Sequence, residues 1–136
     1  IAGSEEAFRR VDHDYPLAAA QLARAHGTPT YVLNSSTNAD RNARVFYLRV
    51  KGETEHDIAQ IGFRSLTCVR PGLIEGDRDE FRVGERIGIA VLRTFGSVLP
   101  KRWRTNPADC IAAMMLDAAM TAAPGMHVIG SERMTR

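Results

Sequence analysis

The 136-residue sequence has little of several features that mark specialised classes of protein. Its two cysteines, Cys68 and Cys110, lie far apart and form no C-x-x-C motif, which argues against a disulfide scaffold or a zinc ribbon and favours a reducing compartment. No apolar run reaches the length of a membrane span. No two glycines lie closer than four positions, so the phosphate-binding motif G-x-G-x-x-G occurs nowhere.

The charge is also close to balanced, because 18 Lys and Arg face 16 Asp and Glu. The net charge of +2 does not indicate a nucleic-acid or membrane-surface partner. The four histidines show no metal-ligand spacing with the cysteines, so no metal site is expected. We therefore expect a cytoplasmic protein that binds neither nucleic acid nor membrane.

What the sequence does contain is an alternation of helical and extended patterns, typical of a single α/β domain over residues 1–136. Ser4, followed by two glutamates, predicts the start of a first helix that Pro16 should kink or break. Asn106 and Pro107 predict the start of the last helix, with Asn106 as its capping residue. Because a helix joins the two clearest strands, the sheet should be parallel. The expected helices are 5–27, 45–61, 85–95 and 106–124, the expected strands are 30–34, 65–69 and 127–130, and 72–84 is a charged loop.

Tyr47 and Lys51 form the strongest chemical signal. Residues four apart lie on one face of a helix, so the phenol and the ammonium can reach the same point. An ammonium beside a phenol favours the phenolate and lowers its pKa from about 10, which makes Tyr47 a candidate general acid and base. On the pair alone, a chance arrangement on a surface helix is the better interpretation.

Two serines add context to this pair. Ser35 and Ser36 directly follow the expected strand 30–34, at the carboxyl end where α/β folds place their chemistry. A hydroxyl there can bond a substrate carbonyl while Tyr47 moves the proton. The alternative is that Ser-Ser-Thr-Asn is ordinary turn composition.

A third group follows the next strand. Arg70, Pro71 and Gly72 come directly after residues 65–69. Proline and glycine commonly end strands, which is the simpler explanation. The order of the three groups along the chain is what favours a catalytic site.

Taken in this order, the residues resemble the short-chain dehydrogenase/reductase superfamily. The resemblance is to its extended or atypical branch, which includes the Tat-interacting oxidoreductase-like proteins and their small bacterial relatives. It rests on the segments 2–12, 32–36, 46–53 and 69–72. It implies the C-terminal part of a doubly wound Rossmann-type parallel sheet flanked by helices, with the N-terminal glycine-rich strand, turn and helix absent from this chain.

The resemblance also implies roles for individual residues. Tyr47 would be the acid/base, and Lys51 would tune it and touch the nicotinamide ribose. Ser36, with Ser35 as its rival, would be the active-site serine. Asp12 lies where extended members often have an asparagine. The implied cofactor contacts are Lys51, Arg70, Pro71 and Gly72.

The function implied is that of an NAD(P)-dependent oxidoreductase or nucleotide-sugar-epimerase-like protein with a small-molecule substrate. The alternative is a non-catalytic dinucleotide-binding regulatory or interaction protein on the same scaffold. The cofactor would be NADP or NAD, which the resemblance does not distinguish. We expect weak binding by this chain alone, because the glycine-rich cradle is not in it.

Two expectations concern association. Extended members commonly pair through the helix before the serine strand and the Tyr-Lys helix, so the resemblance implies a homodimer through helices 5–27 and 45–61. In a doubly wound sheet, the strand Thr30–Asn34 would also lie beside a strand preceding Ile1. We expect a missing N-terminal segment or another chain to cover its free edge, since nothing in its sequence protects that edge.

Overall fold

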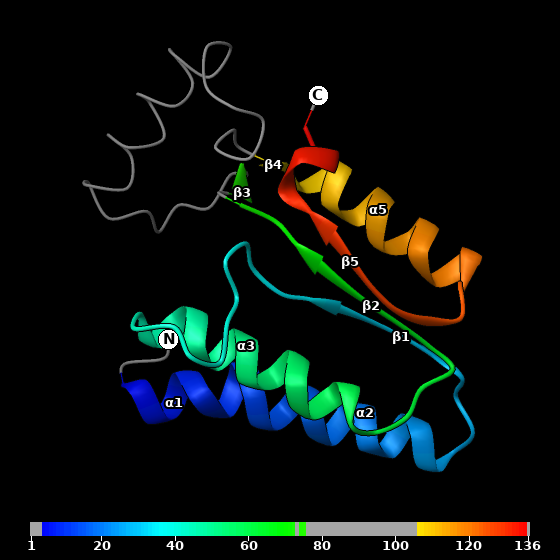
Figure 1. The fold of residues 1–136 in the computed structure, drawn as a ribbon, viewed down its shortest axis with the longest axis horizontal. Coiled ribbons are helices and arrows are strands. Elements are labelled where there is room, and N and C mark those ends of the chain that lie inside the picture. The colour runs from blue at the N-terminus through cyan, green and yellow to red at the C-terminus, as the bar shows by residue number, and fades with distance from the viewer. Residues whose placement is uncertain (1–3, 73, 76–105, 136) are drawn as a thin grey trace.

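The computed structural model describes residues 4–72, 74–75 and 106–135, and these form an α/β fold around a parallel sheet (Figure 1). The sheet has the order β1-β2-β5, where β1 is Thr30–Asn34, β2 is Ser65–Arg70 and β5 is Gly125–Gly130. Both neighbouring pairs are parallel, with Thr30 beside Ser65 and Ser65 beside Gly125. A partial Rossmann-like sheet is therefore confirmed.

Helices cover both faces of this sheet. One side carries a continuous helical run made of α1 (Glu5–Arg9), the π-helical segment η1 (Arg10–Asp14) and α2 (Tyr15–Ala25), together with α3 (Phe46–Ala59). The other side carries α5 (Ala108–Thr121) (Figure 1). A short parallel pair, β3 (Ile74–Glu75) with β4 (Asn106–Pro107), and the 3-10 turn η3 (Ser131–Arg133) complete the described part.

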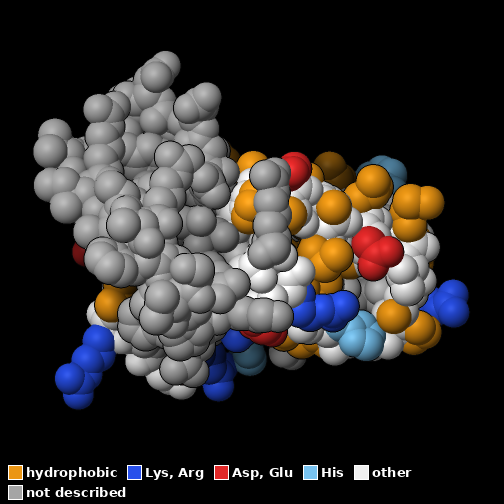
Figure 2. Space-filling model, turned by 90° about the horizontal axis from the view of Figure 1, so that it is seen from above, with side chains coloured by type: hydrophobic (Ala, Val, Ile, Leu, Met, Phe, Trp, Pro, Cys, Tyr) orange, Lys and Arg blue, Asp and Glu red, His pale blue; other side chains and the backbone are white. Residues whose placement is uncertain are grey.

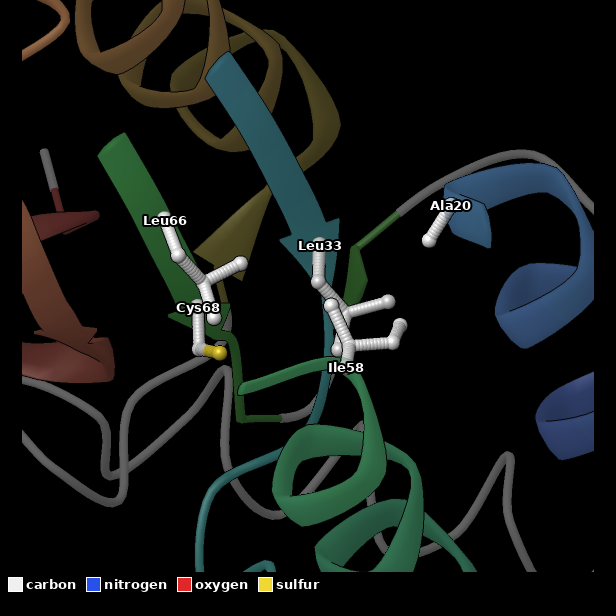
Figure 3. Packing of buried hydrophobic residues seen from close by; sticks show 5 residues of the cluster. All are labelled: Ala20, Leu33, Ile58, Leu66 and Cys68. Atoms are coloured by element: carbon white, nitrogen blue, oxygen red, sulfur yellow. The ribbon is translucent and has the colours of Figure 1, made fainter. Parts of the chain in front are cut away.

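Each helical layer has its own hydrophobic core. Between the sheet and the α2–α3 layer, Figure 3 shows Ala20, Leu33, Ile58, Leu66 and Cys68 packed together. On the opposite face α5 packs on a second buried cluster, which consists of Val69, Ile111, Ile129 and Met134. Because both faces are covered, β2 is buried at five successive positions instead of alternating.

Pro16 changes the helix type without interrupting the helical run. The Ser4 hydroxyl accepts a hydrogen bond from the Ala7 N–H at 3.1 Å and so caps α1 as expected. Pro16 has no N–H to donate to the carbonyl of Asp12, four residues earlier. The Thr54 hydroxyl of α3 donates to that carbonyl instead, at 2.9 Å, and the wider π segment ends two residues before the proline. Pro16 thus falls at the change from η1 to α2.

The expected start of the last helix is wrong in one respect. Pro107, with extended backbone, holds the capping position, and Asn106 is fully buried. The Asn106 amide accepts from the Gly72 N–H at 2.6 Å and donates to the carbonyls of Ser131 and Met134. These bonds to remote backbone groups replace the cap.

The last helix ends earlier than expected, and the last strand begins earlier. Helix α5 ends at Thr121, because Ala122 adopts a left-handed conformation with φ 45°, and β5 begins at Gly125. The expected helix 85–95 and nearly all of the expected loop 72–84 lie outside the described residues.

Among the described residues, β1 has one strand neighbour, β2, and no strand lies on its other edge. The expectation that something covers this edge stays a prediction. No helix in the described ranges is both long and apolar enough to cross a membrane. Viewed from the α5 side, hydrophobic side chains make up much of the described surface (Figure 2). The most exposed of the large ones on α5 are Leu116 and Met120.

Candidate functional site

The serine segment and the Arg-Pro-Gly segment meet at the carboxyl ends of β1 and β2. The Ser35 N–H donates to the carbonyl of Val69 at 2.7 Å, and the Thr37 N–H donates to that of Pro71 at 2.9 Å. Two segments more than 30 residues apart in sequence are thereby joined through their backbones. Parallel pairing of the two strands produces this arrangement, as the sequence predicted.

The two serines differ in the state of their hydroxyls. Ser35 is 4% exposed, and within the described residues its Oγ has no hydrogen-bond partner. The Ser36 hydroxyl donates to the carbonyl of Thr37 at 3.3 Å. The desolvation cost of a buried hydroxyl without a partner is not offset by a hydrogen bond. A ligand that hydrogen-bonds to it therefore gains affinity. Burial therefore favours Ser35, whereas the sequence placed Ser36 first.

Tyr47 and Lys51 lie together on α3, as their spacing predicted. The Lys51 Nζ is 5.7 Å from the centre of the Tyr47 ring. That ring also packs on Phe8 of α1, with centroids 5.4 Å apart, and its side chain remains partly exposed. In the described part of the chain, no hydrogen bond joins the Tyr47 hydroxyl to Ser35 or Ser36. The structure thus forms the Tyr-Lys pair on α3 and the serine segment, residues 35–37, at the end of β1. The Tyr47 ring also has aromatic contacts.

Asp12 is a site residue to which the sequence gave no role. The Lys51 Nζ donates to Asp12 Oδ1 at 2.6 Å, and both side chains are largely buried. Asp12 reaches α3 from the π segment η1. The family position of Asp12 was the only signal in the sequence, because the pairing depends on how two helices pack.

Arg70 has an internal partner. Its Nε and Nη2 donate to the two oxygens of Glu55 on α3, at 2.9 and 2.5 Å, and Glu55 is 4% exposed. The hydrogen bonds that Arg70 donates to Glu55 raise the pKa of Arg70, so the guanidinium stays charged. This bidentate pair fixes α3 against the end of β2. The expected contact of Arg70 with a cofactor stays a prediction, and it would use only the donors that Glu55 leaves.

Gly52 lets the segment after the serines lie directly on α3. The Asp40 N–H donates to the carbonyl of Leu48 at 3.2 Å. A Cβ at Gly52 would come within 2.2 Å of the Arg41 nitrogen, which only a residue without a side chain permits. The serine segment and the Tyr-Lys helix are therefore held in direct backbone contact.

Two of these groups have hydrogen-bonding capacity that no contact within the described residues uses. The Lys51 ammonium uses one of its three N–H donors on Asp12 and keeps two. The Ser35 hydroxyl has no hydrogen-bond partner in the described part of the chain. The Gly72 N–H, in contrast, is taken by Asn106. No group of three or more potential metal ligands occurs within the described ranges.

Comparison with known proteins gives the chain its relatives. It is 37% identical over 139 residues to "Protein fmp52, mitochondrial" of Aspergillus niger, a match that covers 97% of this chain and 57% of that protein. It is 36% identical over 123 residues to "Protein HTATIP2" of Rattus norvegicus, covering 88% of this chain and 49% of that protein. The chain is a homologue of Fmp52 and HTATIP2. No family model matches it.

The Fmp52 and HTATIP2 proteins belong to the NAD(P)-binding Rossmann, short-chain-dehydrogenase-like superfamily. The observed parallel sheet agrees with the nicotinamide dinucleotide-binding fold that these relatives imply. The chain spans about half the length of the relatives it matches, 57% for the protein of Aspergillus niger and 58% for that of Emericella nidulans.

The expectation of a cytoplasmic location is wrong. The Fmp52 relatives from three fungi are named as mitochondrial proteins. The expectation rested on two unpaired cysteines, and cysteine content reflects the redox potential of a compartment without identifying the compartment.

Proposed function

We propose that this Fmp52 and HTATIP2 homologue is an NAD(P)-dependent oxidoreductase or epimerase-like protein that transfers a proton through Tyr47, Lys51 and Ser35. The observation that carries the proposal is the Tyr-Lys face on α3, and it is supported by the buried Ser35 hydroxyl at the end of β1, which has no hydrogen-bond partner among the described residues. The substrate class is a small carbonyl compound or the corresponding alcohol. NAD and NADP remain equal candidates.

Each residue has one task in this proposal. A bound nicotinamide supplies or accepts the hydride. The Tyr47 hydroxyl gives a proton to the substrate oxygen or removes one from it. The Lys51 ammonium, held beside the Tyr47 ring, offers its two remaining donors to the ribose and favours the phenolate. Ser35, with Ser36 as its rival, donates a hydrogen bond to the substrate oxygen.

One contact favours the non-catalytic alternative, a dinucleotide-binding regulatory or interaction protein. Asp12 forms a 2.6 Å ion pair with Lys51. A carboxylate this close offsets the positive charge that would otherwise stabilise a phenolate at Tyr47. In this alternative the Lys51 side chain anchors η1 to α3 and moves no proton.

The experiment that distinguishes the catalytic proposal from the non-catalytic alternative uses the protein as the cell produces it. Binding of NAD and of NADP is measured by calorimetry, and turnover is measured with a panel of small aldehydes and ketones. We expect Tyr47→Phe to reduce kcat by about 100-fold or more while changing the cofactor Kd by less than about twofold. Tyr15→Phe, at an exposed position of α2, is the matched control and should change neither quantity.

Two outcomes contradict the catalytic proposal. Cofactor binding without any turnover that depends on Tyr47 favours the non-catalytic alternative. Failure to bind either dinucleotide contradicts both the catalytic proposal and the non-catalytic alternative.

We further propose that the protein forms a homodimer through the first helical run and α3. Exposed apolar side chains on that run support this proposal, namely Val11, Tyr15 and Leu22. Leu22 is 63% exposed, so Leu22→Glu should weaken association without disturbing the core. Light scattering is the measurement, and a wild-type monomer at micromolar concentration contradicts the proposal.

The names of the Fmp52 relatives support a mitochondrial location for this protein. Fractionation of cells that produce it with an epitope tag tests this. Recovery of the protein in the cytosolic fraction alone contradicts it.

A further inference from the structure

A row of charged contacts joins the first helical run to α3. Figure 1 shows the two running side by side. The pairs, in chain order, are Arg9 with Glu53, Asp12 with Lys51, and His13 with Asp57. Each charge of one element faces an opposite charge of the other when the His13 ring is protonated. The third pair is the only one of these whose charge depends on pH in the physiological range.

His13 contacts a carboxylate at each ring nitrogen. Its Nδ1 lies 2.7 Å from Asp14 Oδ1, its Nε2 lies 2.8 Å from Asp57 Oδ2, and the residue is 7% exposed. An ionised carboxylate only accepts hydrogen bonds, and a neutral imidazole carries one N–H. Both contacts are hydrogen bonds only when the ring is doubly protonated. The geometry therefore requires the imidazolium form.

The surroundings of His13 agree with this requirement. Burial lowers the pKa of His13, but the hydrogen bonds to Asp14 and Asp57 outweigh burial and raise that pKa above its ordinary value of 6.5. Arg9 of α1 opposes them weakly by repulsion.

His13 is partnered by the carboxylates of Asp14 and Asp57. Neighbouring titratable groups on α3 and α2 are paired elsewhere or exposed. On α3, Lys51 and Glu53 are paired with other residues of the row. On α2, Tyr15 follows Asp14 directly and is exposed.

We propose that His13 is a positioning residue for Lys51, and that it acts by holding η1 on α3 through Asp57 only while its ring carries two protons. The part that concerns catalysis rests on the proposed function of Lys51. Asp12, the neighbour of His13 in η1, is the residue that pairs with Lys51. Whatever keeps η1 on α3 therefore also keeps the Lys51 ammonium bonded to a carboxylate.

Loss of the proton has a defined consequence. A neutral ring donates to one carboxylate and turns a lone pair toward the other. The bond to Asp14 lies within one turn, whereas the bond to Asp57 joins two elements. Loosening of the Asp57 contact releases η1 from α3, and with it the hold of Asp12 on Lys51. The Asp12 carboxylate then no longer offsets the Lys51 charge, which favours a phenolate at Tyr47 more strongly, so the proposed activity rises with pH.

The same proton affects stability, with a definite sign. The pKa of His13 is raised in the folded protein, so its contribution is complete below pH 6.5 and is lost as pH rises through the raised pKa. The contact between His13 and Asp57 is therefore formed on the acid side of that pKa and weakened on the alkaline side.

The test is an NMR titration of the unmodified protein. The carbon-bound ring protons report each histidine, and the Cε–Hε signals report Lys51. We expect the His13 midpoint to lie above its ordinary value of 6.5, and the Lys51 signals to show an inflection at the His13 midpoint. A His13 midpoint at or below 6.5, or a Lys51 signal without the shared inflection, overturns the proposal.

Two variants complete the test. Asp57→Asn should lower the His13 midpoint and abolish the inflection at Lys51, whereas His127→Gln should leave both unchanged. An unchanged His13 midpoint in Asp57→Asn also overturns the proposal. None of these readouts needs turnover, so they fail separately from the proposed function. If the shared inflection is present but Tyr47→Phe leaves turnover intact, the link between His13 and Lys51 is supported and the catalytic proposal is contradicted.

Discussion

Replacing Gly52 by alanine tests whether the serine segment is seated on α3 as described. A Cβ at this position would lie 2.2 Å from the Arg41 nitrogen and 2.2 Å from the Asp40 carbonyl carbon, whereas ordinary Cβ contacts begin at 3.4 Å. The opposing atoms are backbone, which cannot rotate away as a flexible side chain can. The segment or the helix must therefore move by more than an ångström.

The expected magnitude follows from two opposing effects. Glycine to alanine inside a helix normally stabilises by about 1 kcal/mol. Insertion of a methyl group into a packed contact costs about 1–3 kcal/mol, and a backbone clash lies at the upper end of that range. We expect a net loss of about 2 kcal/mol in the free energy of unfolding.

Urea denaturation followed by circular dichroism measures this change. Gln60→Ala is the matched control, because Gln60 is exposed at the C-terminal end of the same helix and its loss should stay within about 0.5 kcal/mol. Backbone amide signals of Ser36 and Ala39 should also shift in Gly52→Ala, since the Ala39 N–H donates to the Ser36 carbonyl. A Gly52→Ala protein as stable as the wild type would refute the close contact between the segment and α3.

Three further predictions concern buried polar groups. Asn106→Ala should lower the free energy of unfolding by about 2–3 kcal/mol, because it removes the three hydrogen bonds that a fully buried amide makes to the Gly72 N–H and to the carbonyls of Ser131 and Met134, and thermal or urea denaturation measures it. Glu55→Ala should cost about 2 kcal/mol in the same assay, less than the 3–5 kcal/mol typical of a fully buried pair, because Arg70 is partly exposed. Under native conditions a thiol reagent should modify Cys110 and spare Cys68, since burial raises the pKa of Cys68 to about 12. Equal rates at the two cysteines would contradict the described core.

Local patterns predicted the elements, because short-range chemistry decides them. The strand 30–34 is found with the predicted limits, and the predicted helix 45–61 is found as Phe46–Ala59. The same short-range geometry placed Tyr47 beside Lys51. Parallel pairing of β1 with β2 then brought the serines next to the Arg-Pro-Gly segment.

What the sequence could not predict are the partners that lie far along the chain. Lys51 bonds a carboxylate 39 residues away, and the Asn106 amide bonds a backbone group 34 residues away. No local rule distinguishes these bonds from solvation of the same side chains. The choice between Ser35 and Ser36 stays a prediction, and the sequence offers little help with it, since the state of each hydroxyl depends on the partners that the fold provides.

The π segment η1 determines how the first helical run responds to a change of length. Phe8, Asp12, Ala20 and Arg24 all contact α3, the core or the turn that follows α3, at spacings that are multiples of four. In a regular α-helix of 3.6 residues per turn, each step of four rotates by about 40° away from such a line. Deleting one residue from η1 could leave a regular helix, yet it would turn α1 by about 100° relative to α2. A one-residue deletion that spares helicity would then carry Phe8 out of contact with Tyr47, so this segment should tolerate substitutions more readily than deletions.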